Sequence, residues 1–98
     1  NDRDAKKDFL EAYRLDRDLR NSSGIAFDLE GISLVDARSG HPRTAARKML
    51  EAAGLQSAIG RTDSARKDVE FVRSVLVPAG QKDLSGTGGV LDRWFQGE

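Results

Sequence analysis

The first 20 residues carry the clearest pattern of apolar and polar positions. At 100° per residue, the apolar side chains from Ala5 to Leu19, Leu10 excepted, fall on one stripe about 160° wide, which is typical of a half-buried helix. Asp2 and Asp4 lie where the helix dipole favours negative charge. The polar and small residues at 21–24 then favour a stop. The pattern therefore predicts a helix over 2–20.

The pattern over residues 25–38 fits two structures. Ile25, Phe27 and Leu29 alternate with polar or small residues, which is typical of a strand, and Gly31 would turn the chain into a second strand. Leu29 and Ile32 also keep helical spacing, and Ser23 could cap a helix. Acidic residues are depleted in strands, and Glu-Gly is a poor hairpin turn. We favour a short helix and keep a β-hairpin at 25–35 as the alternative.

Two further helices are predicted after the break at 39–41. Proline is favoured at the first helical position, so one helix should begin at Pro42 and run to Ala53, with Gly54 as its stop. A connector over 55–61 leads to a helix from about Thr62 that Pro78 should end. We see no internal repeat of 20 to 50 residues.

The C-terminal part has a different composition. Residues 78–89 contain four glycines, and residues 90–98 hold a short apolar group. We therefore predict a helical core domain at 1–77, a glycine-rich tether or loop at 78–89, and a short apolar helix at 90–98 that packs on the core or on a partner. The fold class is all-α, a small bundle of four to five short helices, with an α+β fold containing the hairpin as the alternative.

Composition excludes several classes of protein. Ninety-eight residues make one domain, and 16 basic and 16 acidic side chains cancel. The absence of cysteine excludes disulfides and thiolate zinc sites. No apolar run approaches the roughly 20 residues that span a bilayer, so we expect no membrane partner. Arginine outnumbers lysine 11 to 5, which fits GC-rich bacterial coding, and we expect the chain to be a domain of a larger bacterial protein.

Candidate chemistry is sparse. His41 is the only histidine, and we interpret it as a solvated loop residue with no nucleophile and acid arranged around it. Gly86, Gly88 and Gly89 do not form a phosphate loop, because valine and leucine follow where lysine and a hydroxyl residue are needed. We therefore predict neither catalysis nor a cofactor nor a metal site.

Charge is distributed unevenly along the chain. Residues 1–36 hold six basic and nine acidic groups, a net charge of −3, whereas residues 37–73 hold eight and four, a net charge of +4. Residues four apart share a helix face, so a basic ridge could contact phosphates. The candidate phosphate-binding residues are Arg43, Arg47, Lys48, Arg66 and Lys67.

The remaining candidate is the apolar C-terminal segment, whose helical spacing and aromatic side chains suit docking into a partner's groove. Its candidate partner-binding residues are Leu91, Trp94 and Phe95. The function we expect is non-catalytic: a protein–protein interaction or adaptor domain, with nucleic-acid binding through the basic 38–73 section as the alternative. Exchange of the C-terminal segment could also make a homodimer. We favour a cytoplasmic location and leave a secreted effector domain open.

Overall fold

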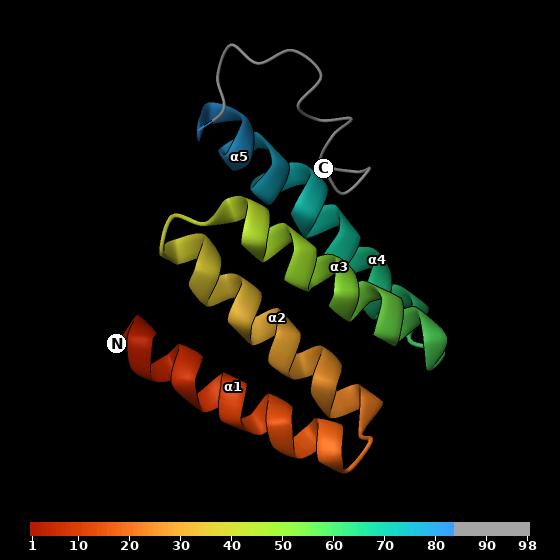
Figure 1. Ribbon diagram of the computed structural model, residues 1–98. Helices are drawn as coiled ribbons and strands as arrows, with labels where there is room; N and C mark the ends of the chain where they lie inside the picture. The colour runs from red at the N-terminus through yellow and green to blue at the C-terminus, as the bar shows by residue number, and fades with distance from the viewer. Residues whose placement is uncertain (84–98) are drawn as a thin grey trace.

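The computed structural model describes residues 1–83, and these residues form helices joined by short turns (Figure 1). The helices are α1 (Asp2–Asp18), α2 (Ser22–Arg38), α3 (Pro42–Ala58), α4 (Thr62–Phe71), the π-helical η1 (Val72–Leu76) and α5 (Val77–Asp83). No strand occurs among the described residues. The small all-α bundle is confirmed, and the alternative β-hairpin at 25–35 is wrong.

Helix α2 was the ambiguous stretch because it packs against two neighbours. It lies between α1 and α3, so buried residues occur around much of its circumference and blur the helical period (Figure 1). Its N-cap is Asn21 rather than Ser23. The Asn21 Oδ1 atom accepts a hydrogen bond from the backbone N–H of Gly24 at 3.2 Å, which satisfies a free donor of the first turn.

Gly54 does not end α3. The helix continues through it to Ala58. A Cβ atom added at Gly54 would meet no atom within 4 Å, so close packing does not require glycine here. The glycine that ends the helix is Gly60, whose φ of +83° is a left-handed conformation that glycine adopts at little cost. The predicted connector at 55–61 is therefore mostly the last turn of α3.

Pro78 does not end the fourth helix either. Proline has no N–H and its ring crowds the carbonyl four residues earlier, so a regular α-helix breaks there. Here the turn immediately before it, Val72–Leu76, is π-helical, and a π-turn is one of the local adjustments that accommodate such disruptions within a continuing helix. The segment 78–83, predicted as part of a tether, is helical. Residues 84–89 and the predicted C-terminal helix at 90–98, with Leu91, Trp94 and Phe95, lie outside the described residues.

Helices α1 to α4 begin at residues 2, 22, 42 and 62, a spacing of 20 residues. The three turns between them are alike: residues 20, 40 and 60 have positive φ, and the next N–H donates to the carbonyl five residues earlier. These last bonds run from 21 to 16, from 41 to 36 and from 61 to 56, at 2.8, 2.9 and 2.7 Å. This is the Schellman ending of a helix, repeated three times.

The regular spacing reveals a repeat that we did not expect from the sequence. Leu-Glu-Ala at 10–12 recurs at 50–52, and Leu15 recurs as Leu55, so α1 and α3 are related by a shift of 40 residues. The partly buried positions of α1 are 5, 6, 9, 12, 13 and 16, and the same positions in α3, shifted by 40, are buried. Residues 1–40 and 41–80 are therefore two versions of one helix pair. The expectation of no repeat was wrong because identity between the two copies is confined to a few positions.

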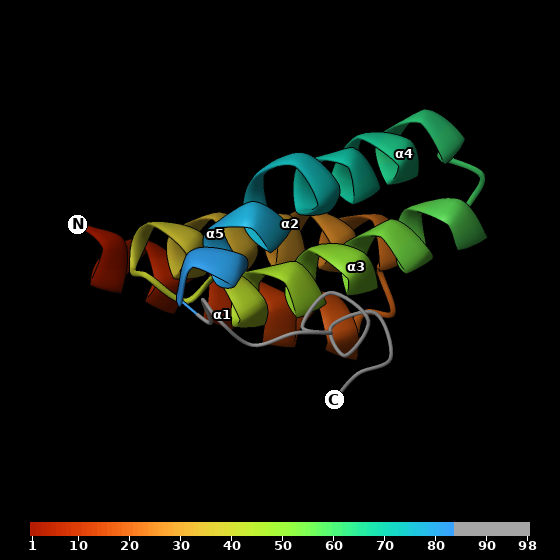
Figure 2. The same ribbon diagram turned by 90° about the horizontal axis from the view of Figure 1, so that it is seen from above.

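The helices form an open row in which each packs mainly on its neighbours in the chain (Figures 1 and 2). One apolar cluster joins α3 to η1 and α5: Ala45, Ala46, Met49, Val72, Leu76 and Val77. A second cluster, Ala26, Leu29 and Ala52, joins α2 to α3, with Tyr13 of α1 packed against it. Helix α1 is at the edge of the row and contains no buried residue. Alanines at the α2–α3 contact let these two helices approach closely.

Candidate functional site

The repeat displays the same surface motif twice. On α1, Arg3, Lys7 and Leu10 are spaced so that they share one helix face, and on α3 the residues 40 positions later are Arg43, Arg47 and Leu50. We call these two triplets the basic ridges. Leu10 is 38% exposed and Leu50 36%, so each ridge ends in a leucine that is partly open to solvent. A surface that recurs with the repeat is presented in the same direction by both helix pairs.

The ridge of α1 borders a hollow of about 430 Å³. The described residues that line it are Arg3, Lys6, Lys7, Leu10, Glu11 and Arg14. Four of these side chains are cationic and one is anionic, so the hollow favours a negatively charged ligand. Leu10 supplies an apolar contact within the same surface.

The ridge of α3 borders a groove between α3 and α4 with a volume of about 560 Å³. Leu50, Ala53 and Val69 provide its apolar surface, and Arg66 and Arg73 provide positive charge. Leu50 therefore belongs both to the ridge and to the groove. The described lining is completed by Gly54, Ser57, Thr62, Ala65 and Glu70.

The predicted phosphate-binding residues do not form one cluster on one element. Arg43, which is partly buried, and Arg47, which is exposed, share the α3 ridge. Lys48 follows Arg47 directly, so it lies about 100° further around the helix. Arg66 lines the groove, and its Nη1 atom lies 3.6 Å from Oδ1 of Asp63. Lys67 is exposed on α4.

Sequence reasoning missed three members of these surfaces on α1 and one on η1. Arg3, Lys7 and Leu10 belong to the segment whose net charge is negative, so charge summed over a long window concealed them. Arg73 was counted in the basic section but was not linked to Arg66. Comparing the sequence with itself at a shift of 40 residues would have found the α1 ridge.

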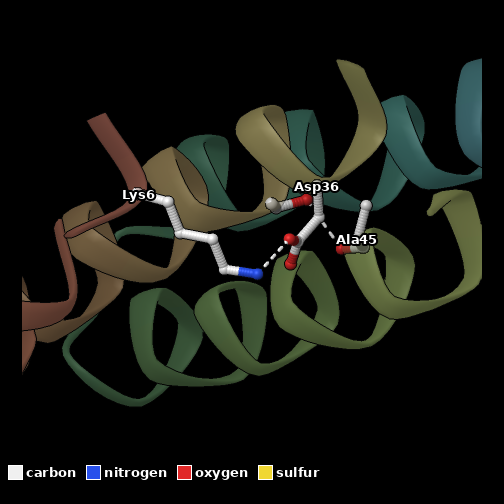
Figure 3. A network of polar contacts seen from close by, with 4 residues as sticks. Lys6, Asp36 and Ala45 are labelled. Carbon is white, nitrogen blue, oxygen red and sulfur yellow. Dashed lines mark hydrogen bonds and ion pairs between the residues drawn. The ribbon is translucent and has the colours of Figure 1, made fainter. Parts of the chain in front are cut away.

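A polar contact joins α1 to α2. Lys6 extends toward Asp36, with 2.6 Å between Nζ and Oδ1, and Asp36 is 3% exposed (Figure 3). Close by, the hydroxyl of Ser33 donates to the carbonyl oxygen of Ala45 at 2.6 Å and links α2 to α3 (Figure 3). Both contacts are buried or half-buried, and together they link three consecutive helices.

Two buried aspartates, again 40 residues apart, each face another carboxyl group. Burial, followed by a hydrogen bond and charge repulsion from Asp16, raises the pKa of Asp28 to about 7. Burial, with the same two effects from Glu30, raises the pKa of Asp68 to about 7. Each pair therefore holds a proton near neutral pH. These pairs join α1 to α2 and α2 to α4, so protonation contributes to packing.

The rest of the described region holds little chemistry beyond these features. His41 is exposed at the N-cap of α3, and its side chain makes no cap hydrogen bond. Residues 1–83 contain no group of three or more histidine, cysteine or acidic side chains arranged to hold a metal ion. Within the same residues, no helix has the length and apolarity needed to cross a membrane.

Comparison with protein-family models, with curated proteins and with solved structures finds no match to this chain.

Proposed function

We propose that this chain is a non-catalytic protein-interaction module whose basic ridges bind an acidic, partly apolar segment of another polypeptide. The recurrence of arginine, a second cation and leucine on α1 and α3 is the observation that supports it. Arrays of helix pairs commonly bind along surfaces made of equivalent positions in successive repeats. The arginine-rich composition fits an adaptor domain of a larger bacterial protein.

A polypeptide fits the ridges better than a nucleic acid does. Leu10 and Leu50 are partly exposed within the ridges, where an apolar partner side chain would cover them and a phosphate would not. The chain has no net charge, which also disfavours a general phosphate-binding surface.

The test compares two probes on the full chain. One is a fluorescein-labelled peptide with alternating glutamate and leucine, and the other is a labelled DNA duplex, both followed by fluorescence anisotropy. We expect the peptide to bind, Arg47→Glu to weaken it at least tenfold, and Leu50→Ser to weaken it severalfold, because each variant removes one ridge contact.

Lys67→Glu is the matched control, since it makes the same charge change at an exposed residue outside the ridges. It should leave peptide binding within about twofold. Peptide binding that Arg47→Glu and Leu50→Ser leave unchanged would refute the proposal. Tighter binding of DNA, weakened equally by Arg47→Glu and Lys67→Glu and unaffected by Leu50→Ser, would establish the nucleic-acid alternative instead.

A further inference from the structure

Helix α1 has an exposed face whose equivalent on α3 is covered by α2. In α3, Ala45 and Ala52 are fully buried, and Leu55 packs against the cluster shared with α2. The equivalent residues of α1 are Ala5, Ala12 and Leu15. The two alanines are only partly buried, and Leu15 is 60% exposed. The repeat thus identifies the missing neighbour as a helix that would pack on α1 as α2 packs on α3.

The opposite end of the row exposes the complementary face. On α2, the residues that face α3 include Ala26, Leu29 and Ser33. Their equivalents on α4 and η1, 40 residues later, are Arg66, Val69 and Arg73, which line the groove described above. Arg66 and Arg73 thus stand at the positions where α2 has the small residues Ala26 and Ser33, which α3 covers. Arg66 is 75% exposed at its side chain, so this face is open apart from the weak pair with Asp63.

The charges of the two exposed faces are opposite. On α1, Asp4, Asp8 and Glu11 are exposed and lie at or beside the face that contains Ala5 and Leu15. The contact between Ser33 and Ala45 fixes the register of α2 on α3. If α4 of one chain packs on α1 of another in this same register, Arg73 of the first chain lies opposite Ala5 of the second, between Asp4 and Asp8. Arg66 falls further along α1, toward Leu15.

We propose that two copies of this chain associate head to tail, with α4 of one copy docked on α1 of the next in the way that α2 docks on α3. This inference concerns the two ends of the row and goes beyond the peptide-binding role of the ridges. The contact uses a different surface on each partner, so each added copy leaves both ends of the assembly open and the chain of copies grows. The contact places Arg66 and Arg73 of one copy near Asp4, Asp8 and Glu11 of the next, so opposite charges meet across it.

The test measures the mass of the full chain by sedimentation equilibrium from micromolar to millimolar concentration. We expect the wild-type average mass to rise with concentration past that of a dimer, given a chain of 10.7 kDa. Asp8→Lys blocks the α1 face and Arg73→Glu blocks the α4 face. Each variant alone should remain monomeric, because one of the two surfaces that every contact needs is reversed in charge.

An equimolar mixture of Asp8→Lys and Arg73→Glu gives the decisive result. One contact between the two variants is unaltered, and the other pairs the two introduced charges, which are opposite in sign, so the mixture should associate again as the wild type does. Arg47→Glu serves as the control, because it lies on a ridge and should self-associate like the wild type. Far-ultraviolet circular dichroism verifies that the variants are folded. A wild-type chain that is monomeric throughout, a mixture that stays monomeric, or variants that dimerise alone would each overturn the proposal.

Discussion

The two helices of each pair contact each other at equivalent positions, but the residues at those positions differ between the pairs. Lys6 of α1 reaches Asp36 of α2 as a half-buried ion pair. At the same positions of the second pair stand Ala46 and Leu76, which belong to one apolar cluster. The turns and the helix register are common to both pairs, so they do not depend on whether this contact is ionic or apolar. The backbone repeat specifies where helices touch, and the side chains decide only how strongly.

A second pair of equivalent contacts shows the same freedom in size. Phe9 of α1 lies against Gly31 of α2, so closely that a Cβ atom on Gly31 would collide with the ring. In the second pair, Met49 is in the core cluster and Phe71 packs against that cluster. The position that has no room for a side chain in the first pair therefore holds a phenylalanine in the second, where Met49 stands in place of Phe9. One repeat position thus accepts residues of very different size, depending on the residue that faces it.

The largest effect we expect comes from breaking the ion pair on one side. Lys6→Ala should lower the free energy of unfolding by about 2 to 3 kcal/mol, because it leaves the buried carboxylate of Asp36 without its counter-ion. The double variant Lys6→Ala with Asp36→Leu installs the residues of the second pair. It should regain most of that loss, since no buried charge remains. Urea denaturation measures the free energy of unfolding of the wild type, the single variant and the double variant.

The control is the exposed pair between Arg38 and Asp2, with 3.3 Å between Nη2 and Oδ1. Arg38→Ala should change stability by less than about 0.5 kcal/mol, because solvent screens exposed charges. If the double variant were no more stable than Lys6→Ala alone, the two helix pairs would not be interchangeable at this contact.

The next effect concerns the two carboxyl pairs, one within the first helix pair and the other between the two helix pairs. The pKa of Asp28 and that of Asp68 are each raised from 3.8 to about 7, so the folded state holds more protons than the unfolded chain between these values. Stability from these groups is therefore complete below about pH 4 and is lost as the pH rises through 7. We therefore expect the free energy of unfolding to fall between pH 5 and pH 7 and to level off near pH 8.

Replacing both aspartates tests this assignment directly. Asp28→Asn with Asp68→Asn should flatten the decline between pH 5 and pH 8, because an amide at each site does not ionise. Asp63→Asn is the matched control, since that side chain is 90% exposed. Parallel pH profiles for the wild type and the double variant, followed by urea denaturation at each pH, would contradict the assignment.

The sequence predicted the helices better than their ends and contacts. The α1 stripe was legible because that helix buries only one side, whereas α2 packs on two sides and fitted both a helix and a hairpin. The local rules make Gly54 and Pro78 stops, but α3 continues past Gly54 with Gln56 buried, and a π-turn precedes Pro78 in a helix that also continues. Local propensity is a weak prior when neighbours supply the stability.

The candidate site was harder to predict because its members are distant in sequence. The basic ridge at Arg43 and Arg47 was found from spacing alone. Its counterpart on α1 and the groove residue Arg73 depend on a repeat carried by very few identities. The pairing of Asp68 with Glu30 joins two helices that are not neighbours in the chain, and no periodicity within one helix reveals such a contact.

The smallest expected effect is at the turns, where the two helix pairs and the link between them are most alike. Gly40 and Gly60 have φ of +84° and +83°, and Arg20 is held at +55° in the same role. A residue with a side chain in this left-handed conformation is strained by roughly 1 kcal/mol. Glycine removes the strain, but its more flexible unfolded chain offsets part of the gain. Arg20→Gly should therefore raise the free energy of unfolding by about 0.5 kcal/mol, measured by urea denaturation.

The reverse change at an equivalent turn completes the test. Gly60→Arg should lower stability by roughly 1 kcal/mol, because the same strain is introduced where it is now absent. The backbone bonds that close the first and third turns are nearly the same length, 2.8 Å from Asn21 to Asp16 and 2.7 Å from Arg61 to Gln56. The turn is thus made whichever residue occupies it. Opposite signs for the two substitutions would show that glycine relieves strain at a turn whose shape the Schellman bonds already determine, whereas equal signs would mean that the side chain of Arg20 itself stabilises the first turn.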